Sequence, residues 1–157
     1  MYGLRGKNPT TLSYHAIATR ASQIVYLIVH LILGVLLWLI MTRNFGIAAN
    51  DSVLYVLTLT AVFSEWGQAV VPAKGRSDVA HTILATIMAL SMTLVPVFLV
   101  FRLSASFVVE LMISISTILV LSLFIFVRYP PRPGTWKLQL LGQLALYTQM
   151  FILIQLV

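Results

Sequence analysis

The stretch ASQIVYLIVHLILGVLLWLIMT, residues 21–42, decides the fold class of this chain. It contains no Asp, Glu, Lys or Arg, and about 20 apolar residues are enough for a helix to cross the hydrocarbon core of a bilayer. A helix is expected because it satisfies its own backbone hydrogen bonds in lipid. The run is longer than the apolar core of a signal peptide and follows a polar segment, so we interpret it as a retained span.

Four further apolar stretches follow at residues 53–71, 79–101, 107–127 and 138–157. The whole chain is 60% hydrophobic and only 9% charged, with a mean hydropathy of +0.99, which is far from the composition of soluble domains. The sequence therefore predicts an all-α polytopic transmembrane bundle of five spans. Residues 1–157 are expected to form a single membrane domain, because the connections are too short to hold a soluble one.

The distribution of basic residues predicts the orientation of the bundle. Arg43 and Arg102 fall on one side of the five predicted spans. The other eight basic residues fall on the opposite side: Arg5, Lys7, Arg20, Lys74, Arg76, Arg128, Arg132 and Lys137. The positive-inside rule then places the N-terminus in the cytoplasm and the C-terminus outside the plasma membrane. The net charge of +6 is expected to meet anionic lipid headgroups rather than nucleic acid.

Several kinds of chemistry are excluded or disfavoured. The chain has no cysteine, which rules out disulfides, thiolate catalysis, iron–sulfur ligation and thioether-bound haem. It has no Gly-rich phosphate loop and no HExxH spacing, so no metal site is expected. The remaining possibility is a b-type haem with His30 and His81 as its two axial ligands. The predicted depths of these residues in the membrane differ by about 9 Å at a rise of about 1.5 Å per residue, which fits the two faces of one porphyrin poorly. We therefore expect no cofactor.

Polar side chains inside the spans recur at intervals of three and four residues, which places them on single helix faces. Because such side chains are costly in lipid, they normally face the interior of the bundle. His30 lies nine residues after Ala21, where the first span begins, and Glu65 lies six residues before Val71, where the second span ends. At the rise of an α-helix, both side chains are then on the order of 10 Å inside the cytoplasmic boundary. The predicted cytoplasm-facing polar pocket consists of Gln23, His30, Glu65, Gln68, His81 and Gln143.

The sequence leaves two interpretations of the pair of Glu65 and His30. In the functional one, the pair is proton-sensitive or holds a polar group of a ligand. In the structural one, Glu65 is neutral, or bonded to His30 and a glutamine, and joins two helices. Either way a partner or a proton is expected, because an unpaired acid in mid-span costs roughly 2.5 to 3.5 kcal/mol on insertion scales.

The segment around the second connection, residues 72–78, has the composition of a helix-terminating turn. Pro72 ends the second span, and Ser77 or Asp78 is expected to cap the next helix. Lys74 and Arg76 lie beside that helix N-terminus and are candidates for binding an anionic headgroup. In the third span, Pro96 is expected to break one backbone hydrogen bond and kink the helix, with Thr93 satisfying a freed carbonyl.

The segment EWGQAVVPAKGRSDVAHTILA, residues 65–85, resembles the loop-to-helix signature of domain-of-unknown-function family 998. The matching positions are Gly67, Pro72 and His81, and GQLALYTQ from Gly142 resembles the Gly-initiated last helix of that family. The family consists of small polytopic membrane proteins. The resemblance therefore implies a fold more than an activity.

Three functions remain open from the sequence. The first is a non-enzymatic protein that binds or moves a small lipid or amphiphile through the polar pocket. The second is a membrane-embedded enzyme acting on a lipid, with Glu65 and His30 or His81 as acid and base. The third is a structural subunit of a larger membrane complex. Membrane lipids are the expected partners, together with a second membrane protein or further copies of this chain.

Overall fold

The structure, a computed structural model, describes residues 19–71, 73, 77–128 and 136–156. These residues form five helices: α2 (Arg20–Leu39), α3 (Ser52–Val70), α4 (Asp78–Arg102), α5 (Phe107–Arg128) and α6 (Trp136–Ile154). A short π-helical segment, η1 (Ile40–Asn44), continues α2. The prediction of an all-α fold with five helices is confirmed for this part of the chain. Each helix begins and ends within three residues of the predicted bounds.

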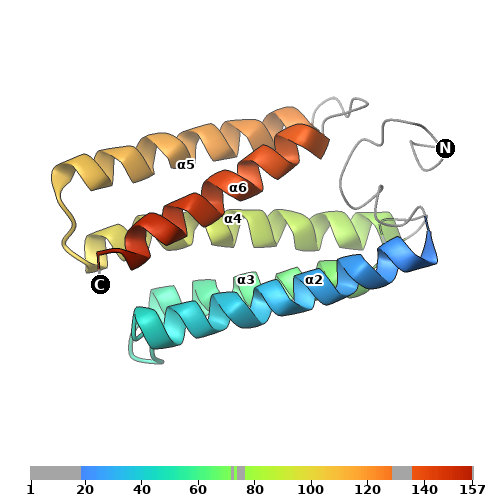
Figure 1. The fold of residues 1–157 in the computed structure, drawn as a ribbon, viewed down its shortest axis with the longest axis horizontal. Coiled ribbons are helices and arrows are strands. Elements are labelled where there is room, and N and C mark those ends of the chain that lie inside the picture. The colour runs from blue at the N-terminus through green and yellow to red at the C-terminus, as the bar shows by residue number, and fades with distance from the viewer. Residues whose placement is uncertain (1–18, 72, 74–76, 129–135, 157) are drawn as a thin grey trace.

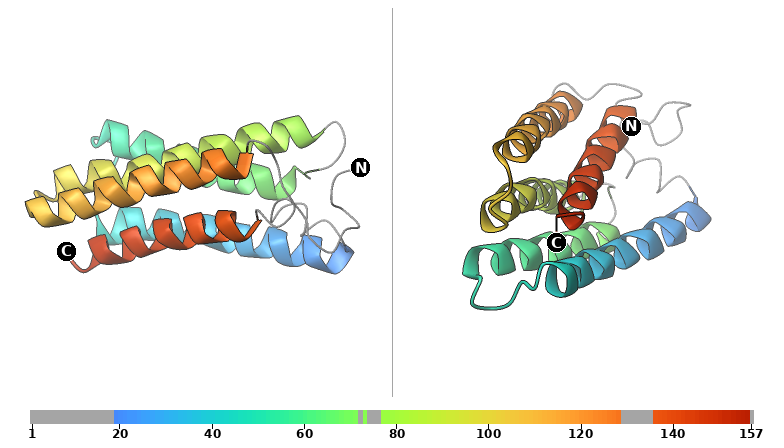
Figure 2. Two further views of the ribbon diagram at one scale, coloured as in Figure 1. Left: turned by 90° about the horizontal axis from the view of Figure 1, so that it is seen from above. Right: turned by 60° about the vertical axis from the view of Figure 1, so that its left-hand side comes forward.

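Helix α4 lies at the centre of the arrangement (Figure 1). On one side α3 packs against α4 and α2 packs against α3, and on the other side α5 and α6 pack against each other and against α4. Figure 2 shows the same two groups of helices from other directions. Short connections make successive helices antiparallel, so the first turns of α2, α4 and α6 lie at one end of the bundle.

Among the described residues, three helices are long and apolar enough to cross a membrane: α2 together with η1 (Arg20–Asn44), α3 and α4. Helix α5 is apolar over Phe107–Leu123, a shorter stretch of described residues. Helix α6 carries Lys137 and the polar residues Gln139, Gln143, Thr148 and Gln149, and it is not among the candidate spans found in the described part of the chain. Large apolar side chains are exposed along all five helices. An apolar outer surface of this extent fits hydrocarbon rather than water and indicates a multi-pass membrane protein.

Helices α2 and α3 approach closely at Gly34. The indole of Trp66 on α3 lies over this glycine, and a Cβ atom there would be 2.8 Å from Trp66 Cδ1 and nearer still to Nε1. Trp66 Nε1 donates a hydrogen bond to the Leu31 carbonyl at 3.2 Å. The missing side chain at residue 34 therefore makes room for the aromatic ring that holds the two helices together.

Two expectations about helix α4 differ from the structure. The helix continues through Pro96, and the kink there stays a prediction. The carbonyl that Pro96 frees is that of Met92, one turn earlier, whereas the Thr93 hydroxyl donates to the Ala89 carbonyl at 2.6 Å. At the start of α4, Ser77 occupies the N-cap position but makes no side-chain capping bond, since its backbone is already helical.

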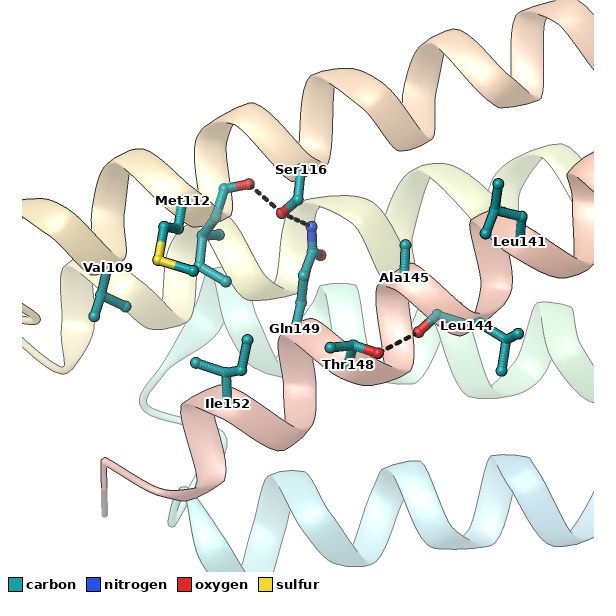
Figure 3. A pocket seen from close by; sticks show the side chains of 10 residues that line it. Val109, Met112, Ser116, Leu141, Leu144, Ala145, Thr148, Gln149 and Ile152 are labelled. Atoms are coloured by element: carbon teal, nitrogen blue, oxygen red, sulfur yellow. Dashed lines mark hydrogen bonds between the residues drawn. The ribbon is translucent and has the colours of Figure 1, made fainter.

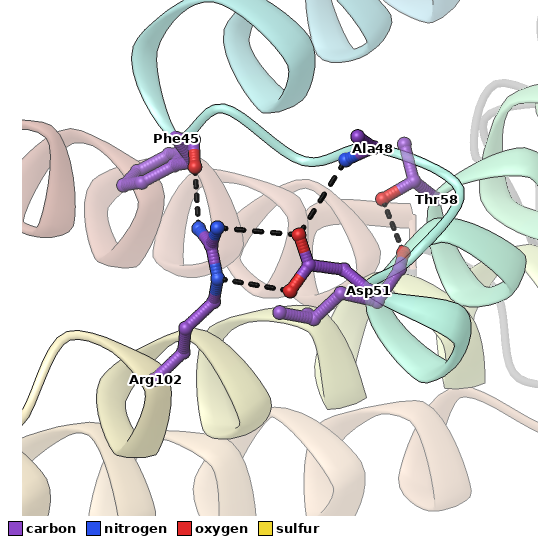
Figure 4. A network of polar contacts seen from close by, with 6 residues as sticks. Phe45, Ala48, Asp51, Thr58 and Arg102 are labelled. Carbon is purple, nitrogen blue, oxygen red and sulfur yellow. Dashed lines mark hydrogen bonds and ion pairs between the residues drawn. The ribbon is translucent and has the colours of Figure 1, made fainter.

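The end of α4 is tied to the connection between η1 and α3 (Figure 4). Arg102 Nε and Nη2 each lie 3.2 Å from an oxygen of Asp51, and Arg102 Nη1 donates to the Phe45 carbonyl. The guanidinium thus bonds a side chain and a backbone group on a segment more than fifty residues away in sequence. This cluster fixes one end of the bundle, opposite the end that holds the predicted site.

Candidate functional site

His30 and Glu65 meet between α2 and α3, as their predicted depths require. His30 Nδ1 lies 2.6 Å from Glu65 Oε1, and both residues are only 7% exposed. The position of His30 is set by the close approach of α2 to α3, one helical turn from Gly34. The ring of Tyr26 packs against the imidazole, with 4.0 Å between the ring centroids.

The second carboxylate oxygen of Glu65 is also bonded. Gln68 Nε2 donates to Glu65 Oε2 at 2.8 Å, and Gln68 is itself buried. Since Oε2 accepts from an amide, a proton on the carboxyl group belongs on Oε1, facing His30. In the ionised form the same position is filled by the proton of His30 Nδ1. One proton therefore lies between Nδ1 and Oε1 in either form.

The space next to Glu65 is small. A cavity of about 10 Å³ reaches the carboxylate between α3, α4 and α6. Its lining consists of Glu65, Met88, Met92, Gln143, Leu146 and Tyr147. A cavity of roughly 10 to 15 Å³ is the minimum for one water molecule. Gln143 thus shares a cavity with Glu65, but this cavity has no room for a lipid or amphiphile.

The remaining predicted pocket residues lie elsewhere. Gln23 is exposed, near the beginning of α2. His81 is buried, and its Nδ1 donates to the Val71 carbonyl at 2.7 Å, so it joins the end of α3 to the first turn of α4. The proposed headgroup ligands Lys74 and Arg76 lie outside the described residues. The structure therefore brings together His30, Glu65 and Gln68, with Gln143 across the small cavity.

A larger pocket lies between α5 and α6, where the sequence analysis placed no site (Figure 3). It has a volume of about 320 Å³ and opens to the outside of the bundle. Seven of the residues that line it are apolar: Val109, Met112, Ile113, Leu141, Leu144, Ala145 and Ile152. The polar ones are Ser116, Thr148 and Gln149. We call this pocket the α5–α6 groove.

Gln149 is the most buried polar residue of the α5–α6 groove, at 2% exposed. Its amide nitrogen Nε2 donates to Ser116 Oγ across the two helices. Its carbonyl oxygen Oε1 is buried and has no hydrogen-bond partner among the described residues. The sequence signal for this site was a serine near the middle of one predicted span and a glutamine near the middle of the next, among several other polar residues.

Sequence reasoning missed Gln149 because it followed the neighbouring face of the last helix, the face that carries Gln143. Gln143 does line the small cavity beside Glu65, together with Tyr147, although Tyr147 is 39% exposed. The buried face of α6 consists of Gly142, Leu146, Gln149, Met150 and Leu153. The spacing of Leu146, Gln149 and Leu153 is equally helical, so periodicity alone does not choose between the two faces.

Within the described part of the chain, no group of three His, Asp or Glu side chains could hold a metal ion. The chain matches no family model, no curated protein and no solved structure. The resemblance to domain-of-unknown-function family 998 therefore stays a prediction. The functional argument depends on the geometry of the His30 cluster and of the α5–α6 groove.

Proposed function

We propose that this chain is a five-span protein of the plasma membrane that binds a small lipid or amphiphile between α5 and α6. The N-terminus is cytoplasmic in this proposal. It is supported by the positions of the basic residues on the described helices: Arg20, Arg128 and Lys137 belong to helix ends at one side of the bundle, and Arg43 and Arg102 to the other. The apolar exposed surfaces of α5 and α6 support their inclusion among the spans.

The observation that carries the lipid-binding proposal is the α5–α6 groove. Its volume of about 320 Å³ lies in the range of small-molecule sites. On α6 the lining residues run from Leu141 to Ile152, about 16 Å of helix at a rise of about 1.5 Å per residue. No charged residue belongs to the lining. A long, apolar and laterally open groove at this depth is suited to an acyl or isoprenoid chain entering from the bilayer.

The polar cluster of His30, Glu65 and Gln68 has a different role in this account. Both carboxylate oxygens already have partners, and the neighbouring cavity is too small for a ligand. We therefore assign the cluster to joining α2 and α3, in line with the structural interpretation of Glu65.

A second candidate role for the cluster is proton exchange, and the bond of 2.6 Å between His30 Nδ1 and Glu65 Oε1 favours it. An acid and an imidazole that share one proton in mid-span are the usual parts of a proton relay. The titratable groups that face the pair are Tyr26 on α2 and Tyr147 on α6. This role would couple the packing of α2 on α3 to the cytoplasmic pH.

The lipid-binding proposal is tested by purifying the protein in a mild detergent and measuring bound lipid by native mass spectrometry. Leu144→Trp places a large ring at the edge of the groove, and Leu140→Trp makes the same change one turn away, on an exposed position that does not line it. We expect bound lipid on the unmodified protein and on the Leu140 variant, and at least a severalfold loss on the Leu144 variant. Equal lipid content in all three proteins would refute the proposal.

A further inference from the structure

We infer that the ligand of the α5–α6 groove is a neutral amphiphile with a hydroxyl group, which donates a hydrogen bond to Gln149 Oε1. This inference rests on the proposed function, because it names the chemistry of the molecule that occupies the same groove. The orphan carbonyl of Gln149 is the observation that carries it. Buried polar atoms are nearly always hydrogen-bonded, so an orphan acceptor in the wall of an apolar pocket marks the place of a missing donor.

The orientation of the Gln149 amide follows from its neighbours. Ser116 Oγ donates its single proton to the Ile113 carbonyl at 3.1 Å, so it can only accept from Gln149 (Figure 3). The amide nitrogen therefore faces Ser116, and the oxygen is the atom left without a partner. The missing group is thus a donor rather than an acceptor.

The other polar groups of the groove already donate their protons within the protein. Thr148 Oγ1 donates to the Leu144 carbonyl at 2.8 Å, within its own helix. Ser116 Oγ donates to the Ile113 carbonyl and accepts from Gln149. Among the described lining residues, Gln149 Oε1 is then the one buried polar atom that lacks a partner.

This arrangement selects one class of ligand. A carboxylate or phosphate would meet no positive charge in the groove, and an ammonium group would meet no counter-charge. A hydroxyl group matches the unpartnered acceptor of Gln149, and an aliphatic body matches the apolar walls. The class that fits is therefore a lipid alcohol with one donor and no charge.

The experiment uses two photoreactive probes in detergent solution: a twelve-carbon primary alcohol with a diazirine on its chain, and the same molecule as its methyl ether. Labelled peptides of α5 and α6 are counted by mass spectrometry. We expect the alcohol to label the groove about three- to tenfold more than the ether, the effect of one hydrogen bond. In Gln149→Met the alcohol should fall to the level of the ether. Gln155→Met, on an exposed residue outside the groove, should keep the difference.

The outcomes separate the two proposals. Equal labelling of the groove by alcohol and ether in the unmodified protein would overturn the assignment of a hydroxyl ligand and leave lipid binding intact. This comparison needs no variant, so it remains decisive if Gln149→Met does not fold. Labelling that avoids the groove with both probes would overturn the proposed function itself. A photoreactive residue can also be placed at Met112, in the lining of the groove. If it crosslinks two copies of the chain, the groove is occupied by a second protomer rather than by a lipid, and the inference is overturned.

Discussion

Glu65 has each of its oxygens bonded to a different side chain, one on the neighbouring helix and one on its own. The bond to His30 spans 35 residues of sequence, whereas the bond to Gln68 spans three. The bond to Gln68 orients the carboxylate within α3, and the bond to His30 joins α3 to α2. In a bundle surrounded by lipid, where apolar contacts between helices gain little over contacts with acyl chains, such a bond contributes to specific helix pairing.

Replacing Glu65 by Ala is expected to destabilise the protein by roughly 1–3 kcal/mol, because it leaves the buried donors of Gln68 and His30 without an acceptor. Glu65→Gln should lose less, since an amide can accept from Gln68 and donate to His30. The measurement is thermal unfolding of the purified variants in one detergent. In the double variant with His30→Ala, the loss should be smaller than the sum of the single losses.

The same variants distinguish the helix-joining role from the proton-exchange role. If the cluster only joins helices, the stability difference between Glu65→Gln and the unmodified protein stays constant between mildly acidic and mildly alkaline pH. A difference that changes across this range would assign the proton role to the pair. Additive losses in the double variant would contradict both roles, because they would mean that the two side chains do not interact.

The meeting of His30 and Glu65 could be predicted from sequence, because both depths follow from helix rise and the two spans are consecutive. Gln149 could not, since its face of α6 is decided by packing against α5 rather than by any local pattern. His81 shows the same limit. Its position one turn into α4 was clear, but its bond to the Val71 carbonyl depends on the path of a turn that periodicity does not describe.

At the scale of the elements, the contact of α2 with α3 depends on the glycine at position 34. The side chain of Trp66 fills the space above it and donates to the Leu31 carbonyl, so one aromatic residue adds both area and a hydrogen bond. Trp38 and Tyr55 make a second aromatic contact between the same helices, edge to face at 5.8 Å. The polar cluster at Glu65 lies on this same interface.

Gly34→Ala is expected to destabilise the pairing of α2 and α3 by about 1–3 kcal/mol, the usual cost of overpacking. The added methyl group would displace the indole of Trp66 and break its bond to Leu31. Val35→Ala, at the next position but on the exposed face of α2, is the control and should change stability little. Thermal unfolding of the two variants in one detergent measures the effect. An unchanged unfolding temperature for Gly34→Ala would show that this close approach is absent.

Across the described part of the molecule, the five predicted spans correspond to five helices, and three of these are long and apolar enough to cross a membrane. The difference comes from α5, whose described apolar part is short, and from α6, which carries several polar residues, among them Gln149 bonded to Ser116. Hydropathy counts such residues as unfavourable even where they are paired. The number of crossings is therefore an inference from packing: α5 and α6 lie alongside α4, which is itself a candidate span.

The number and direction of crossings are tested most directly by single-cysteine labelling, since the chain has no cysteine of its own. Cysteines introduced at Asn50, Ser104, Ser77 and Lys137 probe four connections or helix ends, and a membrane-impermeant maleimide is applied to intact cells and to opened membranes. The account predicts that Asn50→Cys and Ser104→Cys react in intact cells, and that Ser77→Cys and Lys137→Cys react only after the membrane is opened. Labelling of Ser104→Cys and Lys137→Cys from the same side would show that α5 does not cross, and would contradict the five-span bundle.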